Sequence, residues 1–286
     1  MGAGGRPLLE RRSPRLKEKR GATEAGMAIR VIEDADAMQE FALRLCREGA
    51  LPVLVPTMGA LHPGHLSLIE RAKLEGSPVI VSVYVNPLQF GEGEDFAAYP
   101  RTPEEDRRAC EAAGADLLFA PRNLYAADHS TYVVEEALSA GRCGSSRPGH
   151  FRGVATVVVK LLNLTQARAA VFGWKDAQQL SVIRRLVRDL AFPVRIVPVE
   201  VQRDRDGLAW SSRNRYLSPE QRKRAAAFPR ILAAAARRPD GCAWAIAELS
   251  RQPGFRVDYV EKADGRLCGA VWIDKVRLID NFPCEA

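Results

Sequence analysis

The chain has 286 residues, 47% of them hydrophobic and 27% charged, enough to bury a sizeable core in one or two domains. This composition excludes a wholly disordered chain and a fibrous repeat, and the lack of an uncharged apolar run of about 18 residues excludes a transmembrane helix. The formal charge of +7 favours a polyanionic partner such as a nucleic acid, unless that charge is confined to one segment.

Most of the positive charge lies in the first 26 residues. They hold seven basic and three acidic residues, which leaves a net charge of +3 for the other 260. Gly, Pro and charge run throughout, without a periodic apolar face, so we predict a disordered basic tail over 1–26. It lacks the apolar stretch of a secretory signal, and Arg6 stands where a myristoylation signal needs Ser or Thr. A tail without function, with translation starting at Met27, is the alternative.

From residue 34 to residue 201, helical and strand-like patterns alternate. Helices are predicted at 34–48, 65–73, 103–113, 154–164 and 176–190, and strands at 51–55, 79–85, 116–120, 169–173 and 194–201. The strands are short and apolar, which is typical of strands buried on both faces. The alternation therefore predicts an α/β fold with a parallel sheet covered by helices.

The pattern changes after residue 201, where a charged turn at 203–207 indicates a domain boundary. Beyond it the sequence predicts helices at 219–237 and 242–251, strands at 257–261 and 270–279, and loops at 240–241 and 262–266. We therefore expect a smaller α+β domain over 202–286.

The six cysteines are spread along the chain, without a C-x-x-C pair and without a Cys/His cluster at zinc spacing. No export signal accompanies them. We expect free thiols in a reducing, cytoplasmic compartment.

A chemically suggestive pattern begins where the strand at 51–55 ends. The Gly-rich phosphate loops of the Rossmann and Walker-A motifs are both absent, but Gly59 and Gly64 permit close backbone approach in this turn. His62 and His65 lie three residues apart, so they project from one side of a helix N-terminus. Free N–H groups and the helix dipole favour anions there, and both imidazoles can donate to phosphate oxygens. Two partly buried histidines in a tight turn are the alternative interpretation.

The H-x-G-H pattern resembles the signature of the nucleotidylyltransferase and class I aminoacyl-tRNA synthetase superfamily. Six longer blocks, spread over about residues 28–220, resemble the pantothenate synthetase (pantoate–β-alanine ligase) family and come in that family's order. They are P-T-M-G-A-L-H at 56–62, V-N-P-L-Q-F at 85–90, Y-P-R-T at 99–102, R-P-G-H-F at 147–151, F-G-W-K-D-A-Q-Q at 172–179 and S-S-R-N at 211–214. Six separate blocks are far more specific than the histidine pair alone.

The resemblance implies a ligase reaction in two steps. ATP and pantoate form pantoyl adenylate and release pyrophosphate, and β-alanine then attacks the acyl adenylate to give pantothenate and AMP. Mg²⁺ would accompany the ATP, and the family is a cytoplasmic homodimer. The metal ligands stay unknown. Glu105 and Asp106 are candidates for indirect contacts to Mg²⁺, and a solvated helix N-terminus is their alternative explanation.

The resemblance also implies the domain organisation. A Rossmann-like domain over 27–201, with helices on both faces of a parallel sheet, would bind ATP and pantoate. A smaller C-terminal domain over 202–286 would act as a lid that closes over the site.

The residue types suit adenylation, because displacing pyrophosphate requires stabilisation of spread negative charge. Lys175 follows the strand at 169–173, so it lies at the carboxyl end of a strand, where open α/β sheets bind ligands. The segment 211–213 corresponds to the mobile phosphate loop of the superfamily. A solvated lysine and an ordinary polar turn are the respective alternatives. The candidate catalytic residues all donate to phosphate oxygens; they are His62, His65, Lys175, Ser211, Ser212 and Arg213.

Around the nucleotide, the resemblance places five further residues. Gly173 and Asp176 would hold the adenosine ribose, and Asn86 would lie near the β-phosphate. Trp210 would lie near the adenine, and Met58 is grouped with these nucleotide-binding residues.

Around pantoate, the resemblance places two amides and an apolar wall. Gln89 and Gln179 would grip the hydroxyls and the carboxylate, because each amide offers both a donor and an acceptor. Phe90, together with Met58, would line the apolar side of the substrate, and Arg147 would lie in the wall of the site.

Several features depart from the family's usual pattern. Cys143 stands where the family usually has Glu, four residues before Arg147, which removes the expected acidic neighbour of that arginine. Trp174 replaces an acid, Trp210 a methionine and Ala177 an aromatic residue. The C-terminal region is also shortened before residue 255. The phosphate and pantoate ligands are nevertheless in place, so we expect an active enzyme.

The leading hypothesis is a cytoplasmic ligase whose partners are pantoate, β-alanine and ATP, with no nucleic-acid or membrane partner. An impaired or altered-specificity homologue is one alternative, as is a catalytically dead homologue that only dimerises. Another is a different adenylate-forming or nucleotidyl-transferring member of the superfamily. A nucleic-acid-binding protein built on the basic tail would show salt-dependent binding that disappears with residues 1–26.

Overall fold

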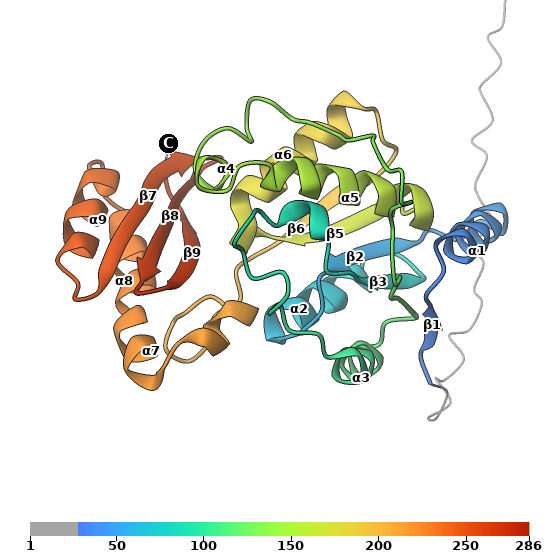
Figure 1. Ribbon diagram of the computed structural model, residues 1–286, viewed down its shortest axis with the longest axis horizontal. Coiled ribbons are helices and arrows are strands. Elements are labelled where there is room, and N and C mark those ends of the chain that lie inside the picture. Colours follow the sequence, from blue (N-terminus) through green and yellow to red (C-terminus); the bar gives the residue numbers. More distant parts are fainter. Residues whose placement is uncertain (1–27, 286) are drawn as a thin grey trace, which may run out of the picture.

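The computed structural model describes residues 28–285, so the tail predicted over 1–26 and Met27 lie outside the described residues. Six parallel strands form one sheet in the order β1-β4-β3-β2-β5-β6 (Figure 1). They are β1 (Arg30–Ile32), β2 (Val53–Thr57), β3 (Val79–Val83), β4 (Leu117–Phe119), β5 (Ala169–Gly173) and β6 (Arg195–Val199). The five predicted strands are confirmed, whereas β1 was missed.

Helices cover both faces of this sheet, as predicted (Figure 1). They are α1 (Ala35–Arg47), α5 (His150–Thr165) and α6 (Ala177–Asp189) on one face, and α2 (Pro63–Ala72) and α3 (Pro103–Ala113) on the other. Successive side chains of a strand point to opposite faces. Leu54 accordingly packs with α1, α5 and α6, and its neighbours Val53 and Val55 pack with α2 and α3. Burial on both faces explains why the strands are continuous apolar runs.

The order of the strands reverses next to β2. The chain runs from β2 to β3 and β4 on one side, and β5 and β6 then follow on the other. In an open parallel sheet, such a reversal leaves a crevice outside the carboxyl ends of the two central strands, where ligands bind. Here β2 leads into His62 and His65, and β5 leads into Lys175. The topology therefore brings these side chains to the same edge of the sheet.

The residues after β6 build a second, antiparallel sheet in the order β7-β8-β9. Its strands are β7 (Phe255–Ala263), β8 (Arg266–Ile273) and β9 (Val276–Pro283), and its helices are α7 (Pro219–Ala225), α8 (Ala227–Ala235) and α9 (Gly241–Ser250). They enclose a core of their own, in which Phe228, Leu232, Leu249 and Leu267 are buried. The expectation of a smaller α+β part is confirmed. No helix within residues 28–285 is long and apolar enough to cross a membrane.

Two elements predicted for this C-terminal part are wrong. The helix predicted at 219–237 is broken between α7 and α8, because Pro229 has no N–H to donate to the carbonyl of Ala225. The strand predicted at 270–279 is a hairpin with its turn at Asp274, whose φ is 53°. Asp274 and Lys275 are two adjacent charged residues between apolar runs, too few to mark a turn by composition.

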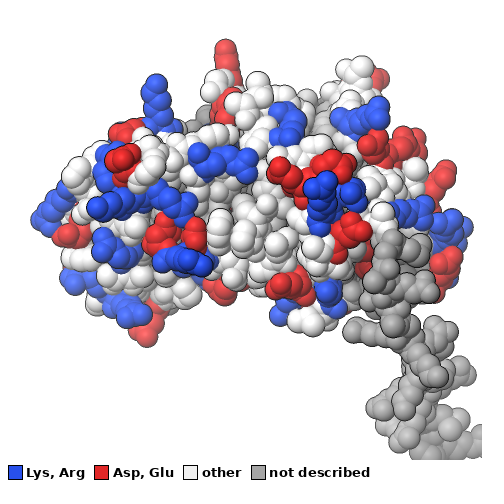
Figure 2. Space-filling view, turned by 90° about the horizontal axis from the view of Figure 1, so that it is seen from below, with Lys and Arg blue, Asp and Glu red and all other residues white. Residues whose placement is uncertain are grey.

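The positive charge of the folded residues belongs to the C-terminal part. Residues 202–285 hold 16 basic and 11 acidic residues, a net charge of +5, whereas residues 28–201 hold 19 basic and 21 acidic residues, a net charge of −2. Figure 2 shows Lys and Arg side chains gathered over the C-terminal part, at the left of that view. A polyanion that approaches the crevice therefore meets favourable charge on the side of the second sheet.

Gly153 allows α5 to approach the turn after β3. A Cβ at this position would lie 2.2 Å from the carbonyl oxygen of Leu88, which is backbone and cannot move aside cheaply. We expect Gly153→Ala to lower the free energy of unfolding by about 1–3 kcal/mol, as overpacking does. Urea unfolding followed by circular dichroism measures this. Gly91→Ala is the matched control, because the nearest atom to its Cβ lies 3.8 Å away, on the Glu94 side chain. Equal losses in the two variants would contradict the argument.

Candidate active site

The turn after β2 places two histidines at the N-terminus of α2. Their rings stack with centroids 3.9 Å apart and planes inclined by 25°. The backbone N–H of His62 donates to Nδ1 of His65 at 3.3 Å. Nδ1 of His65 therefore carries no hydrogen, and its Nε2 is the donor. Gly64 provides the space for this packing, because a Cβ there would lie 3.0 Å from the His62 ring.

Both imidazoles are neutral at pH 7. Burial lowers the pKa of His62 to about 4, and the Lys175 ammonium acts in the same direction. Burial also holds the pKa of His65 well below its ordinary value, with His62 and Lys175 as further causes. A neutral imidazole still donates one N–H. The pair can therefore bind phosphate oxygens by hydrogen bonds without adding positive charge.

Asp106, on α3, holds the histidine turn from outside. Its Oδ2 accepts the N–H of Ala60 at 3.0 Å and its Oδ1 accepts the N–H of Leu61 at 2.7 Å. The residue is 2% exposed, so both carboxylate oxygens are committed to backbone. Glu105 is exposed on the same helix, and neither acid lines the cavities of the site. Their predicted indirect contact with Mg²⁺ gains no support from this geometry.

The turn after β5 carries Lys175 and Asp176. Nζ of Lys175 lies 3.5 Å from Oδ1 of Asp176. Burial on its own would raise the pKa of Asp176, but Lys175 holds it below the ordinary value. Asp176 is therefore ionised at pH 7. The pair offers a cation for phosphate and a carboxylate that can accept from ribose hydroxyls.

The turn after β3 presents Gln89 to the cavity in a fixed orientation. Its Oε1 accepts from Nδ2 of Asn86 at 3.1 Å, and its Nε2 contacts Sδ of Met58 at 2.9 Å. Asn86 is 1% exposed, and the hydroxyl of Tyr125 donates to its Oδ1 at 2.8 Å. Asn86 thus orients the amide of Gln89 in this structure. Its contact with the β-phosphate stays a prediction.

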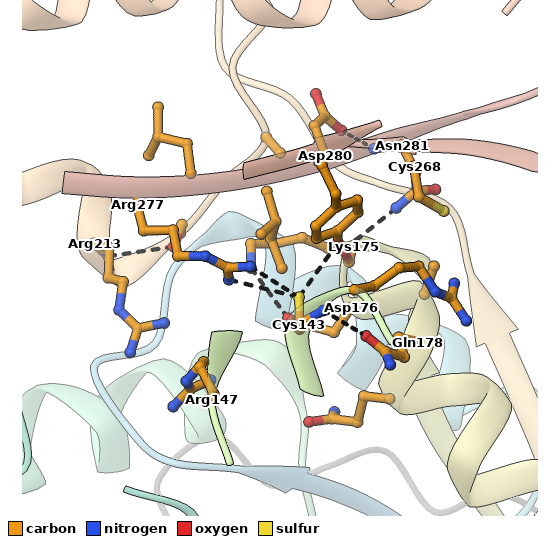
Figure 3. Close-up of a pocket in the computed structure, with 18 of the residues that line it drawn as sticks. Cys143, Arg147, Lys175, Asp176, Gln178, Arg213, Cys268, Arg277, Asp280 and Asn281 are labelled. Carbon is orange, nitrogen blue, oxygen red and sulfur yellow. Dashed lines mark hydrogen bonds and ion pairs between the residues drawn. The ribbon is translucent and has the colours of Figure 1, made fainter. Parts of the chain in front are cut away.

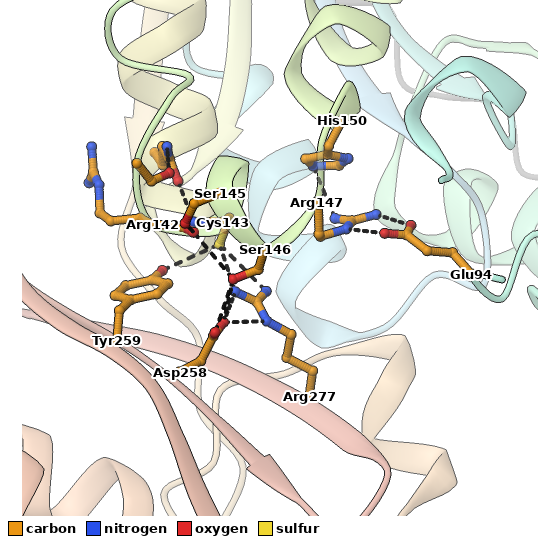
Figure 4. A network of polar contacts seen from close by, with 12 residues as sticks. Glu94, Arg142, Cys143, Ser145, Ser146, Arg147, His150, Asp258, Tyr259 and Arg277 are labelled. Atoms are coloured by element: carbon orange, nitrogen blue, oxygen red, sulfur yellow. Dashed lines mark hydrogen bonds and ion pairs between the residues drawn. The ribbon is translucent and has the colours of Figure 1, made fainter. Parts of the chain in front are cut away.

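Arg147 has an acidic partner that the sequence did not reveal (Figure 4). Its Nε and Nη2 donate to the two carboxylate oxygens of Glu94 at 2.8 and 2.6 Å. Its Nη1 lies 3.1 Å from Nε2 of His150, whose Nδ1 lies 2.9 Å from the carbonyl oxygen of Gln89. A carbonyl only accepts, so Nδ1 of His150 carries the proton and Nε2 accepts from Arg147. Glu94 supplies the acid that is missing at Cys143.

Cys143 faces the C-terminal sheet instead (Figure 4). Its Sγ lies 3.3 Å from the hydroxyl of Tyr259 and 3.4 Å from Nη2 of Arg277. Arg277 finds its carboxylate within its own sheet, in Asp258 at 2.7 Å. Arg277 therefore has a carboxylate partner in Asp258, although the Cys143 thiol beside it is small and offers no carboxylate.

The segment 210–213, which follows the bridge between Arg203 and Ala209, completes the site. Oγ of Ser212 lies 3.3 Å from the hydroxyl of Tyr99, and Nη2 of Arg213 lies 3.1 Å from Oδ1 of Asp95. The Trp210 ring is nearly parallel to His62, with centroids 6.2 Å apart. This segment therefore lies directly against the histidine turn, although some 150 residues separate them in sequence.

One cavity brings the predicted residues together. It holds about 1390 Å³ of space, part of it open to solvent, and 15 of the 17 predicted site residues line it. They are Met58, His62, His65, Asn86, Gln89, Phe90, Arg147, Gly173, Lys175, Asp176, Gln179, Trp210, Ser211, Ser212 and Arg213. A second space of about 840 Å³ adjoins it against the C-terminal sheet (Figure 3) and shares Arg147, Lys175 and Arg213 with it.

A family model described as pantoate-beta-alanine ligase matches residues 30–283. The chain belongs to this family. The pantothenate synthetase of Heliobacterium modesticaldum is 47% identical over 280 residues, which cover 90% of this chain and 100% of that protein.

Solved structures of the same family share the fold. The crystal structure of pantothenate synthetase from Thermus thermophilus has a TM-score of 0.83 at 43% identity and covers 89% of this chain and 99% of its own. The pantoate-beta-alanine ligase of Francisella tularensis, solved in complex with beta-gamma ATP and beta-alanine, has a TM-score of 0.81 at 34% identity. That match covers 90% of this chain and 98% of the other.

Sequence reasoning missed the residues that hold these groups in place. Glu94 lies 53 residues from its partner Arg147, so no local pattern joins them. Gln178 stands inside the block at 172–179, and its Oε1 accepts the N–H of Cys143 at 2.9 Å. His150 stands inside the R-P-G-H-F block, which was the available signal for it.

Asp106→Asn tests whether the carboxylate fastens the histidine turn. An amide has one acceptor oxygen and would place its NH₂ against a backbone N–H, so one of the two bonds is lost. We expect faster hydrogen exchange over residues 58–64 and a loss of about 1–3 kcal/mol in the free energy of unfolding. Glu104→Gln, an exposed neighbour on the same helix, should change neither. Wild-type exchange in Asp106→Asn would contradict the proposed tether.

The stability of the fold should fall on acidification through the buried His150. Burial, and next Arg147, lowers its pKa to about 4, whereas an unfolded histidine titrates at about 6.5. Between these values the unfolded chain binds more protons, so the free energy of unfolding falls as the pH drops from 6.5 to 4, by at most about 3 kcal/mol for this group. Urea unfolding at several pH values measures it. His150→Gln should show a shallower fall, and parallel curves would refute the assignment.

Proposed function

We propose that this chain catalyses the ATP-dependent condensation of pantoate with β-alanine to pantothenate, releasing AMP and pyrophosphate. The observation that carries the proposal is the single cavity lined by all the residues that family resemblance assigns to ATP and pantoate. Its position at the reversal of strand order is where open α/β sheets bind ligands. The relative from Francisella tularensis, solved with beta-gamma ATP and beta-alanine, supports the same substrates.

In the first step, a carboxylate oxygen of pantoate attacks the α-phosphorus of ATP, and the bond to the pyrophosphate oxygen breaks. Lys175 and Arg213 would stabilise the negative charge that spreads over the phosphates. The neutral His62 and His65 would donate their N–H groups to phosphate oxygens. Gln89, held by Asn86, would keep pantoate in the orientation that attack requires.

In the second step, the amine of β-alanine attacks the acyl carbonyl. The new C–N bond forms as the C–O bond to AMP breaks, and the amine releases a proton. Arg147 lines both spaces of the site and is fixed by Glu94 and His150. It is therefore placed to bind an anionic group as the second substrate enters.

Further features are proposed from the resemblance. No group of three His, Cys, Asp or Glu side chains in residues 28–285 could hold a metal ion. Mg²⁺ would thus be bound by the triphosphate and water, as this ion commonly is. We also propose a homodimer, a cytoplasmic location, a division between domains near residue 201, and closure of the C-terminal part over the site.

Exchange of labelled pyrophosphate into ATP tests the proposal, because it reports adenylation alone. We expect exchange that requires pantoate and not β-alanine. Lys175→Ala should slow it by about 100- to 1000-fold, as loss of a transition-state charge contact does, while Lys275→Ala, in an exposed hairpin turn, should leave it unchanged. No exchange with pantoate present would refute the proposal and favour a dead homologue. Exchange without pantoate would indicate another adenylate-forming activity.

A further inference from the structure

Strand β9 is the edge of the C-terminal sheet that faces the cavity. Its alternate residues point to opposite faces. Val276 and Leu278 enter the core of the C-terminal part, whereas Ile279 packs against the core under the parallel sheet. Asn281 lies on the same face as Ile279 and reaches the turn that carries Lys175 (Figure 3).

Asn281 binds the backbone of that turn directly. Its Nδ2 donates to the carbonyl oxygen of Trp174 at 2.7 Å and to that of Lys175 at 3.3 Å. Its Oδ1 accepts from Nε of Arg266. The residue is 1% exposed, so the amide is shielded from water. Removing the donor would leave the two carbonyls without this partner.

Arg266 and Trp174 hold the same turn from a second side. The guanidinium of Arg266 lies 4.8 Å from the centre of the Trp174 ring, and that of Arg184 lies 5.0 Å from it. Arg266 is itself fixed by Glu200, which follows β6, through two bonds of 3.0 and 2.8 Å. Trp174 thus replaces the family's usual acid with a ring that two arginines contact.

The position of the Lys175 ammonium depends on this turn. Its contact with Asp176 is long, at 3.5 Å, and the side chain has four rotatable bonds. Because this contact is weak, the position of the ammonium depends on the backbone of the turn after β5. Displacement of a reacting group by about 1 Å costs on the order of 100-fold in rate.

We propose that Asn281 is a positioning residue for the adenylation step. Its amide holds the carbonyls of Trp174 and Lys175, and so sets where the Lys175 ammonium meets the phosphates. The C-terminal sheet therefore contributes to catalysis through the backbone of the turn after β5. This inference rests on the proposed ligase function.

Asn281→Ala tests it through pantoate-dependent pyrophosphate exchange. We expect the maximal exchange rate to fall by about tenfold, with the KM values for ATP and pantoate within about threefold of wild type. In a Lys175→Ala background, Asn281→Ala should change the rate by less than about twofold, because the group it positions is gone. Asn281→Ser serves as the second variant if the alanine variant fails to fold. Val276→Ala, on the other face of β9, controls for loosening of the sheet and should keep the wild-type exchange rate.

Two results would overturn the inference. One is a wild-type maximal rate with raised KM values in Asn281→Ala. The other is the same fold-loss from Asn281→Ala with and without Lys175. A wild-type chain that shows no exchange at all would instead refute the ligase function, so the two failures are distinguishable.

Discussion

The pairing of β2 with β3 on one side and with β5 on the other is the constraint on which the site depends. Because the order of strands reverses there, the turns after β2 and β5 open onto one crevice, and His62 and Lys175 reach the same space. The other side chains of the site come from segments that reach this same edge of the parallel sheet. The turn after β3 brings Gln89, and the chain beyond β6 returns with Trp210 and Arg213.

The two arginines of the cavity are positioned by acids rather than left free. Arg147 pairs with Glu94 at 2.6 Å and Arg213 with Asp95 at 3.1 Å. Such pairs hold the cations in place before a ligand arrives and reduce the reorganisation needed when charge develops.

The two histidines complement these pairs, since they are neutral and still donate. A site rich in donors and nearly balanced in charge suits a reaction between two anions, pantoate and ATP. Within residues 28–285, the excess of positive charge lies in the C-terminal part.

Two of the substituted positions are compensated from elsewhere in the fold. At Cys143 the missing carboxylate is replaced twice, by Glu94 for Arg147 and by Asp258 for Arg277. At Trp174 the missing acid is replaced by a ring between the parallel sheet and the C-terminal sheet, in contact with Arg266. Both contacts join segments that are far apart in sequence, so neither partner can be found from the motif alone.

The sequence by itself determined the alternation of strands and helices over residues 34–201, the histidine turn at the start of α2, and the family to which the six blocks belong. These features are local, because periodicity, turn residues and short motifs involve neighbouring positions. It also predicted 15 residues that line one cavity, since each lies in a motif that the family resemblance carries.

Only the tertiary structure decided what holds those residues and in which state. The bonds of Asp106 to the histidine turn, of Glu94 to Arg147 and of Asn281 to the turn of Lys175 join distant segments, and no spacing rule encodes them. The neutral state of His62 depends on burial and on a lysine brought near by the sheet. Desolvation and proximity in space exist only once the chain is folded. The sequence therefore predicts which side chains form the site, whereas the fold determines their contacts and protonation states.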